Sequence, residues 1–289
     1  MTASNQDSTH PMVGVDSFSP AEIARLVEGR GAAKAAAPVV TTLVLSIVAG
    51  AFIALGAVFA TVISTGSTLG VGPTRLLAGA AFSLGLILVV VAGAELFTGN
   101  NLLMMSWVSR RISFRRLLKN WVIVYVGNAL GAVSVATLVY AAEWWSVADH
   151  AVGATALSIA AAKSSLSFEV AFVRGVLANA LVCLAIWLAT AGRSVTDKVL
   201  AIIFPISAFV AAGFEHSIAN MYFIPIGLLL SDEPAVTSEA AIPPDALASL
   251  DLAGLLTNIS AATLGNVVGG AGLVGVVYWF VYLRARPAS

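Results

Sequence analysis

Long apolar stretches, separated by short polar segments, make up most of this chain. A helix needs ~20 apolar residues to cross the ~30 Å hydrocarbon layer of a membrane, and six stretches reach or approach that length. The pattern predicts spans over residues 38–65, 74–108, 117–145, 168–190, 198–230 and 255–283. It therefore indicates an all-α membrane protein with six transmembrane helices.

Polar residues interrupt the second and the fifth span. Residues 90–100 read VVAGAELFTGN and residues 210–220 read VAAGFEHSIAN, and both fit the pattern V-x-A-G-x-E-x-x-x-x-N. Polar and ionisable groups at membrane depth are costly, so they usually face a cavity, pair with each other or mark a conduction path. Matching breaks in the two halves of a chain also point to the binding site of a transporter. We expect helices 2 and 5 to be broken at these two places.

A second pair of motifs repeats in the same way. Asn120 and Asn128 lie eight positions apart in the third span, and Asn258 and Asn266 lie eight positions apart in the sixth. The breaks are offset by 120 positions and the asparagine pairs by 138, a difference that the long acidic loop before the sixth span takes up. Because each half has three spans, the halves must point in opposite directions across the membrane. The pattern predicts two inverted three-helix repeats whose broken helices meet near the midplane.

The chain divides into three parts. Residues 1–37 form a polar arm, residues 38–285 the six-helix transmembrane domain and residues 286–289 a short tail. In the arm, Ser19 precedes Pro20 and Glu22 follows three positions after Ser19, which is the spacing of a capping box. We predict a short amphipathic helix over 20–34, on the membrane surface or against the mouth of the transmembrane domain. A disordered tail with a little local helix is the alternative.

Composition agrees with an integral membrane protein. The 289 residues are 59% hydrophobic and 10% charged, with a mean hydropathy of +0.94, whereas roughly 25% of the residues of a soluble domain are charged. The formal net charge of zero gives no reason to expect a nucleic-acid partner. No cleavable signal is expected, because residues 1–37 lack a long apolar segment. The single cysteine, Cys183, lies in an apolar run and is expected to pack in the core.

The basic residues predict the orientation. Lysine and arginine are concentrated in cytoplasmic segments of membrane proteins. If the N-terminus is cytoplasmic, only Arg75, Lys163 and Arg174 of the 15 lysines and arginines fall outside the inner segments. We therefore expect a multi-pass protein of a cell membrane with both termini in the cytoplasm.

His216 is the candidate for chemistry in the fifth span, because it is the one histidine in an apolar span. An interrupted helix exposes backbone N–H groups, and its dipole favours negative charge there. Thr98, the backbone near Gly99 and Asn100, and His216 are therefore expected to converge on a small anion. With an ordinary pKa of about 6.5, a histidine can donate a hydrogen bond and exchange a proton near neutral pH. A neutral histidine that only holds the structure together is the alternative.

For the other polar residues at the breaks, we expect a structural role first. Glu95 and Glu215 are expected to bond the broken backbone, with cation binding as the alternative. Asn128 and Asn266 lie in G-N-x-x-G contexts, where small residues let helices approach closely. The structural polar set is Glu95, Asn100, Glu215, Asn220, Asn128 and Asn266.

Four large apolar residues lie close to the breaks in sequence, namely Phe82, Leu86, Leu96 and Phe209. Core packing is the default role of such residues. A hydrophobic constriction that strips water from an ion is the functional alternative.

Several motifs resemble those of the formate/nitrite transporter family. They are AELFTGN at 94–100, NWVIVYVGN at 120–128, GRSVTDK at 192–198, GFEHSIANMYFIPIG at 213–227, TLGNVVGG at 263–270 and YWFVYLR at 278–284. The resemblance extends over about residues 30–285 and is nearer to the formate-channel branch. It implies an aquaporin-like protomer, a homopentamer, one anion pore per protomer and a bacterial inner membrane.

The resemblance also implies roles for the matching positions. Leu96, Phe97 and Thr98 would form the mobile loop after the second-helix break. Phe82, Leu86 and Phe209 would line two constrictions. His216 would line the central chamber with Thr98 and Asn179, and Lys163 would supply positive charge at an entrance.

Formate is the expected substrate, with nitrite or hydrosulfide as the alternative within the family. A neutral-solute channel is less favoured, because the N-P-A motifs of that class are missing from the breaks. A membrane-embedded enzyme with Glu95, Glu215 and His216 as metal ligands is also disfavoured, since no H-E-x-x-H spacing occurs. We expect no enzymatic activity, no cofactor and no metal.

Overall fold

The computed structural model describes residues 16–284, and the chain is helical without a strand in that range. The helices are α1 Pro20–Ala36, α2 Val39–Ser64, α3 Val71–Ala92, α4 Phe97–Asn100, α5 Leu103–Val108, α6 Phe114–Ala141, α7 Ala151–Ser164, α8 Phe168–Ala191, α9 Val195–Ala211, α10 Ser217–Leu230, α11 Pro234–Ala240, α12 Pro244–Ala248, α13 Leu252–Val267 and α14 Val277–Tyr282. A short 3₁₀ turn, η1, covers Trp144–Ser146, and a π-helical segment, η2 (Val268–Val276), joins α13 to α14. The first 15 residues of the predicted arm and the predicted tail over 286–289 lie outside the described residues.

Five helical segments in the described range are long and apolar enough to cross a membrane. They are α2, α3, α6, α8 and the continuous α13–η2–α14 segment. The apolar helix α10 is shorter. It follows α9 after the non-helical segment at 212–216. These segments make the chain a multi-pass helical membrane protein.

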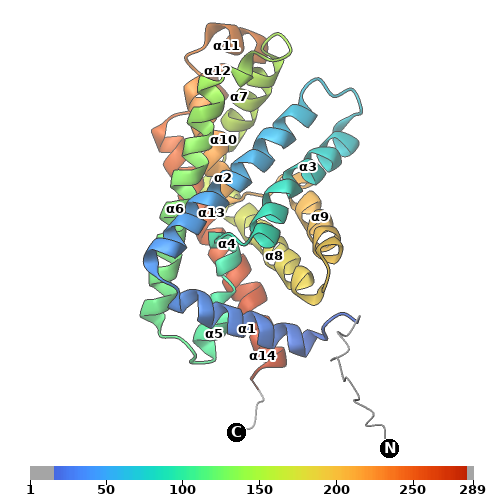
Figure 1. The fold of residues 1–289 in the computed structure, drawn as a ribbon. Helices are drawn as coiled ribbons and strands as arrows, with labels where there is room; N and C mark the ends of the chain where they lie inside the picture. Colours follow the sequence, from blue (N-terminus) through green and yellow to red (C-terminus); the bar gives the residue numbers. More distant parts are fainter. Residues whose placement is uncertain (1–15, 285–289) are drawn as a thin grey trace, which may run out of the picture.

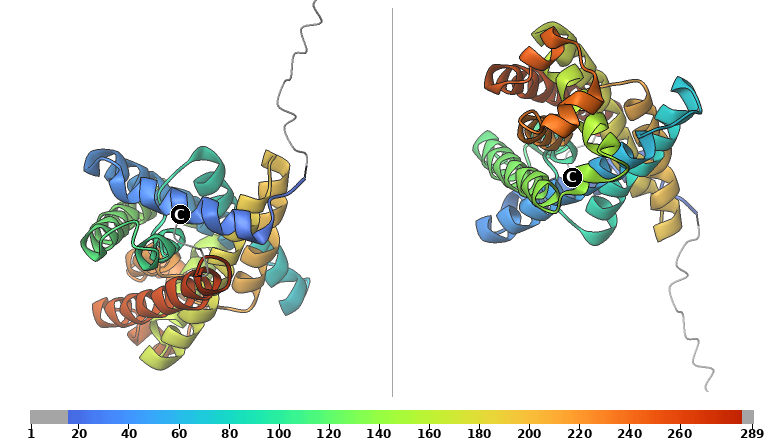
Figure 2. Two further views of the ribbon diagram at one scale, coloured as in Figure 1. Left: turned by 90° about the horizontal axis from the view of Figure 1, so that it is seen from below. Right: turned by 90° about the horizontal axis from the view of Figure 1, so that it is seen from above.

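The helices form a bundle with two distinct ends (Figure 1). At the lower end of Figure 1, α1 lies across the bundle beside α5 and α14, and both ends of the described chain are found there. At the upper end, α11 and α12 cover α7 and α10. Figure 2 shows α1 crossing the whole lower face. The terms lower and upper are used in this sense below.

Helix α1 begins with the hydrogen bonds that its sequence predicts. The carboxylate of Glu22 accepts from the Ser19 hydroxyl at 2.6 Å and from the Ser19 backbone N–H at 2.8 Å. These two bonds hold the pKa of Glu22 below its ordinary value. The helix is anchored further along by a bond from the Ser106 hydroxyl to the Glu28 carbonyl at 2.6 Å.

Glycines allow two pairs of helices to touch along their backbones. A side chain at Gly131 of α6 would collide with the Ile47 carbonyl of α2. A side chain at Gly269 of η2 would collide with the Val176 carbonyl of α8. Close approach through small residues is the usual way in which helices associate inside a membrane. The frame of the bundle is therefore built from tight contacts that larger residues would open.

Two other glycines end the helices at the breaks. Gly93 follows α3 with φ of 83°, and Gly213 lies in the turn after α9 with φ of 72°. Glycine adopts this left-handed conformation without the penalty of a Cβ atom, which makes it the usual residue after a helix end. The chain then crosses a short non-helical segment and starts α4 at Phe97 or α10 at Ser217.

The structure corrects two of the predicted boundaries. The third span ends at Ala141 rather than near Trp145, because the chain turns sharply through left-handed residues at Glu143 and 148–150. The segment between the predicted third and fourth spans, residues 146–167, lies outside the predicted spans and is largely helix α7. Its alanine-rich sequence is too short to read as a span, but it is buried against α10 and α11, which stabilises a helix by packing rather than by length.

Candidate functional site

Thr98 and His216 meet in the interior of the bundle. Thr98 lies in α4 and His216 is the N-cap of α10, so each comes from one of the two breaks. The Thr98 hydroxyl and His216 Nε2 are 3.0 Å apart, and both side chains are almost fully buried. The two breaks, which are 118 residues apart at these positions, therefore join at one polar contact.

The surroundings of His216 decide where its proton lies. Nδ1 accepts a hydrogen bond from the Ala219 backbone N–H at 3.1 Å, so Nδ1 carries no hydrogen in this arrangement. A neutral ring then has its proton on Nε2, which donates to the Thr98 hydroxyl. The Phe209 ring stacks on the imidazole at a centroid distance of 5.9 Å and fixes its plane. The Thr98–His216 contact, which we call the centre, thus offers hydrogen-bond donors to its surroundings.

One asparagine fastens each break to a neighbouring helix. At the break between α3 and α4, the lower break, Asn128 Oδ1 accepts from the Phe97 N–H at 2.8 Å. The Asn128 amide donates to the carbonyls of Ser46 and Glu95. At the break between α9 and α10, the upper break, Asn266 makes the matching hydrogen bonds. Its Oδ1 accepts from the Ser217 N–H at 2.9 Å, and its amide donates to the carbonyls of Gly175 and Glu215.

These bonds satisfy backbone groups that the interrupted helices leave free, and an unpaired backbone group is very costly at membrane depth. The two asparagines therefore explain how non-helical backbone persists in the middle of the bundle.

A lysine, a glutamate and two asparagines form a cluster beside each break. In the upper cluster, Lys163 pairs with Glu215 at 3.0 Å, and Glu215 accepts from Asn220 at 2.6 Å and from Asn258 at 3.1 Å. Asn220 also donates to Asn258 Oδ1 at 2.6 Å. The Glu215 carboxylate is therefore hydrogen-bonded as well as paired, which offsets part of the cost of its burial.

The lower cluster repeats this arrangement. Lys34 pairs with Glu95 at 3.2 Å and donates to Asn100 Oδ1 at 2.8 Å. Asn100 in turn donates to Glu95 at 2.7 Å and to Asn120 at 3.0 Å. The Glu95 and Glu215 carboxylates are thus both held by lysine and asparagine side chains rather than by the broken backbone, and the structural role expected for them stays a prediction.

Two cavities approach the Thr98–His216 contact from opposite ends. The lower vestibule, about 320 Å³, lies between α1 and the lower break. The upper vestibule, about 270 Å³, lies between α3, α7, α9 and α10 and reaches His216 itself. Both contain three basic residues and one acidic residue, so both have a positive balance. The lower set is Arg30, Lys34, Lys198 and Glu95, and the upper set is Arg75, Lys163, Arg174 and Glu215.

Large apolar side chains line the approach to the Thr98–His216 contact. Phe82 and Phe209 meet edge to face at a centroid distance of 5.6 Å, and both line the upper vestibule. Leu96 lines the lower vestibule, and Leu86 is buried on α3 between residues that line the two cavities. Phe97 packs away from both cavities, against the Tyr125 ring at 5.0 Å. Buried rings and leucines therefore lie along the interior between the two vestibules.

Asn179 lies elsewhere than expected. Its amide donates to Asn101 Oδ1 at 3.0 Å and to the Asn266 carbonyl at 2.7 Å, and it is not among the residues that line either vestibule. Cys183, one turn along α8, donates to the Thr98 carbonyl at 3.4 Å. Asn179 therefore supports the centre from behind, and the part it plays in the chamber stays a prediction.

Sequence reasoning missed the second lysine and two arginines. Lys34 occupies the position in the lower cluster that Lys163 occupies in the upper one, and Arg75 and Arg174 line the upper vestibule. Their sequence signal is weak, because each lies near a helix end and reaches the site through a long flexible side chain. Within residues 16–284, no three His, Cys, Asp or Glu side chains are grouped to hold a metal ion.

The fold and the site define a class, that of helical membrane transport proteins in which two broken helices meet at a buried polar centre. Comparison with known proteins gives the family. Residues 21–280 match the family model described as formate/nitrite transporter. The chain belongs to the formate/nitrite transporter family, which confirms the resemblance found in its motifs.

Relatives and a solved structure are similar over nearly the whole chain. The formate channel FocA of Escherichia coli (strain K12) is 40% identical over 273 residues, covering 93% of this chain and 96% of the relative. A probable formate transporter of Methanothermobacter thermautotrophicus is also 40% identical, covering 92% of this chain and 97% of that one. A solved pentameric formate channel with formate bound has a TM-score of 0.79 at 38% identity, covering 85% of this chain and 98% of that one.

Proposed function

We propose that this protein conducts a small monovalent anion, formate before others, through a pore in each protomer. The observation that carries the proposal is the pair of positively balanced vestibules that face each other across the buried Thr98–His216 contact. A vestibule lined by one sign of charge concentrates the opposite ion at its mouth. The formate channels among its relatives support the choice of formate.

The proposed architecture is two inverted repeats of three spans each, in an aquaporin-like protomer. The matched bonds of Asn128 and Asn266 and the matched lysine clusters support an internal two-fold relation. We place the protein in a bacterial inner membrane as a homopentamer with both termini cytoplasmic. The basic residues at the lower end and the pentameric formate channel to which the chain is similar support this arrangement.

The proposed route runs from one vestibule to the other through two hydrophobic constrictions. Phe82, Leu86 and Phe209 line the pathway, together with Leu96 and the mobile segment that continues through Phe97 and Thr98. The anion loses water at the rings and leucines and is received by the donors at His216, with Asn179 supporting the chamber. Lys163 raises the local anion concentration at the upper entrance, and Lys34 does so at the lower one. Burial of a lone charge is expensive, so the donors at the centre must replace part of the lost hydration.

The pH dependence follows from the hydrogen bonds of His216. The neutral ring holds an anion through Nε2–H and the Thr98 hydroxyl, but it has no proton to give away. A proton can pass to the anion only from an imidazolium ring, and that ring has a hydrogen on Nδ1 which would face the N–H of Ala219. Proton transfer therefore requires the ring to turn away from Ala219 first. We propose that acidic conditions favour this turned state, and that the neutral acid then crosses the apolar constriction.

The test is formate flux into proteoliposomes at mildly acidic and mildly basic pH, with nitrite, hydrosulfide and lactate as competitors. Wild-type protein should carry formate faster at the acidic pH. His216→Phe removes the donor, and flux should fall by about 10²–10³-fold if one preorganised donor is lost, as at other sites that stabilise a buried negative charge. His216→Gln keeps an amide N–H close to Nε2 and should retain formate flux while losing the pH dependence.

Two results would contradict the proposal. Formate flux no greater than that of empty liposomes would remove the transport function. Unchanged flux with unchanged pH dependence in His216→Phe would leave transport in place and remove the proton role of His216.

A further inference from the structure

The three basic residues of the upper vestibule differ in what they bind. Lys163 is engaged with the Glu215 carboxylate. Arg75 donates from Nη1 to the Ala211 carbonyl at 3.2 Å, at the end of α9. Arg174 has no hydrogen bond or ion pair from its guanidinium to any of the described residues 16–284. Among the described residues, one of the three charges therefore has no protein partner.

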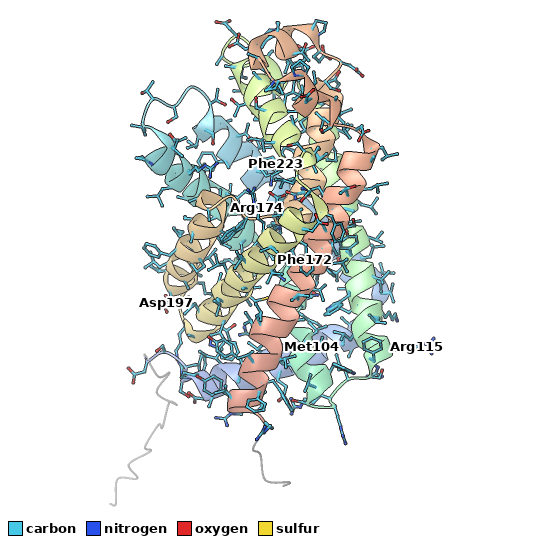
Figure 3. The ribbon with its side chains drawn as sticks, turned by 180° about the vertical axis from the view of Figure 1, so that it is seen from behind. Met104, Arg115, Phe172, Arg174, Asp197 and Phe223 are labelled. Atoms are coloured by element: carbon cyan, nitrogen blue, oxygen red, sulfur yellow. The ribbon has the colours of Figure 1, made fainter. Side chains whose placement is uncertain are left out.

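Arg174 is fixed beside the centre by its own backbone. Its carbonyl accepts from the Glu215 N–H at 3.3 Å, so the residue lies directly against the upper break. The next residue, Gly175, packs closely on α13, where a Cβ atom would lie 2.8 Å from the Ala262 carbonyl oxygen. Figure 3 shows Arg174 within the upper half of the bundle in the region of Phe223, and both residues line the upper vestibule.

The guanidinium of Arg174, unpaired among the described residues, lies inside the transmembrane bundle, where a charge without a partner is unfavourable. An arginine inside a membrane protein is costly and usually pairs or faces a water-filled cavity. Arg174 is partly buried and faces a cavity of about 270 Å³, which is large enough for a small hydrated anion. A guanidinium presents two parallel N–H groups that match the two oxygens of a carboxylate, whereas the ammonium of a lysine does not.

We propose that Arg174, assisted by Arg75, is a carboxylate-binding site in the upper vestibule. This inference rests on the proposed transport function and adds to it a first binding step, in the vestibule that Arg174 shares with His216. The site takes a small planar carboxylate through the two N–H groups of Arg174. The anion then passes from Arg174 to the donors at His216, which lines the same vestibule.

The test measures formate entry from each face separately in planar bilayers, over a range of formate concentrations and at low and high ionic strength. Arg174→Leu should lower flux from the upper face by about tenfold at low formate and low salt, the smallest gain that charge focusing usually provides. At saturating formate the flux should be close to that of the wild type. The defect should shrink at ~1 M salt, where the Debye length falls to ~3 Å. Arg174→Lys keeps the charge but not the paired donors. Its flux from the upper face should lie between that of the wild type and that of Arg174→Leu.

The matched control is Arg115→Leu. It removes the same charge from an exposed position at the edge of the lower end, outside both vestibules (Figure 3). Its flux from both faces should equal that of the wild type. An equal loss in Arg174→Leu at every concentration, every salt and both faces would mean a structural role only and would overturn the proposal, as would no loss at low formate and low salt.

A binding measurement separates this inference from the transport function. Formate should raise the unfolding temperature of the detergent-solubilised wild type more than chloride does, and the difference should vanish in Arg174→Leu. If the wild type carries no formate but shows this difference, the transport function fails and the carboxylate site stands. If formate is carried but no difference depends on Arg174, the site fails and the transport function stands.

Discussion

At the scale of single residues, the two lysine–glutamate pairs have the same partners but different surroundings. The side chains of Lys163 and Glu215 are 16% and 3% exposed, whereas those of Lys34 and Glu95 are 35% and 13% exposed. Removal of one partner from a buried pair leaves an uncompensated charge, which costs about 3–5 kcal/mol, but a solvated pair contributes only about 0–1 kcal/mol. The two clusters should therefore differ in their contribution to stability.

Lys163→Met should lower the free energy of unfolding by about 3–5 kcal/mol, because Glu215 is left buried without its partner. Lys34→Met, the matched change in the lower cluster, should cost about 1 kcal/mol or less. Thermal or denaturant unfolding in detergent measures both values. The double variant Lys163→Met/Glu215→Gln should regain most of the loss. An equal cost for both single variants would contradict the role assigned to burial.

The polar residues of the centre could be predicted from the sequence because polar groups in apolar segments are expensive and therefore noticeable. His216, Thr98 and the two glutamates stand out for that reason. The partners that complete their environment were harder to find. Lys34 and Arg174 belong to helix ends, where basic residues are common, and Asn179 is turned toward Asn101 rather than toward a cavity. Side-chain direction across helices depends on packing that no local pattern records.

At the scale of helices, the spans and both breaks follow from hydropathy, but two elements do not. Helix α7 is too short to stand out as a span, and its stability comes from burial against α10. The π-helical segment η2 has no pattern of its own either. It lies where Gly269 and Gly270 meet α8, and π-helical turns are frequent at functional sites.

The glycines of η2 offer a matched test of helix packing. Gly269→Ala should destabilise the protein by about 1–3 kcal/mol, because its Cβ atom would press on the Val176 carbonyl and push α8 away. Gly272→Ala lies in the same segment with open space around it, and should be neutral or stabilise by up to about 1 kcal/mol.

Unfolding in detergent and formate flux are the two measurements for this pair. We expect Gly269→Ala to lose flux as well, because α8 holds both Arg174 and Asn179. If Gly269→Ala were as stable as Gly272→Ala, the close contact between η2 and α8 would not matter.

At the scale of the whole molecule, large apolar side chains face outward on most of the long helices. They include Val122 at 61% exposed on α6, Val173 at 55% on α8 and Leu256 at 60% on α13. Such a surface is covered by lipid or by neighbouring protomers. The sequence of one protomer does not say which helices take which role, because lipid and a neighbouring helix are equally apolar.

The detergent-solubilised particle should have a protein mass five times the 29.6 kDa of the chain, as in the pentameric formate channel to which it is similar. Light scattering or native mass spectrometry measures this mass, and it should not change on dilution, because obligate assemblies bury large areas. A stable monomer or tetramer would contradict the proposed assembly.

A close glycine contact between the two proposed halves has a consequence for the speed of transport. A side chain at Gly79 of α3, in the first half, would collide with the backbone of Ser207 on α9, in the second half. Backbones that touch in this way cannot slide past each other without opening empty space, so the rocking of one half against the other that carriers use is disfavoured here. The parts left free to move are the short segments at the two breaks and the side chains between the vestibules, which rearrange within nanoseconds to microseconds, whereas whole domains need microseconds to milliseconds. Passage should therefore show the turnover of a channel, with many ions crossing during the time that a carrier needs for one cycle.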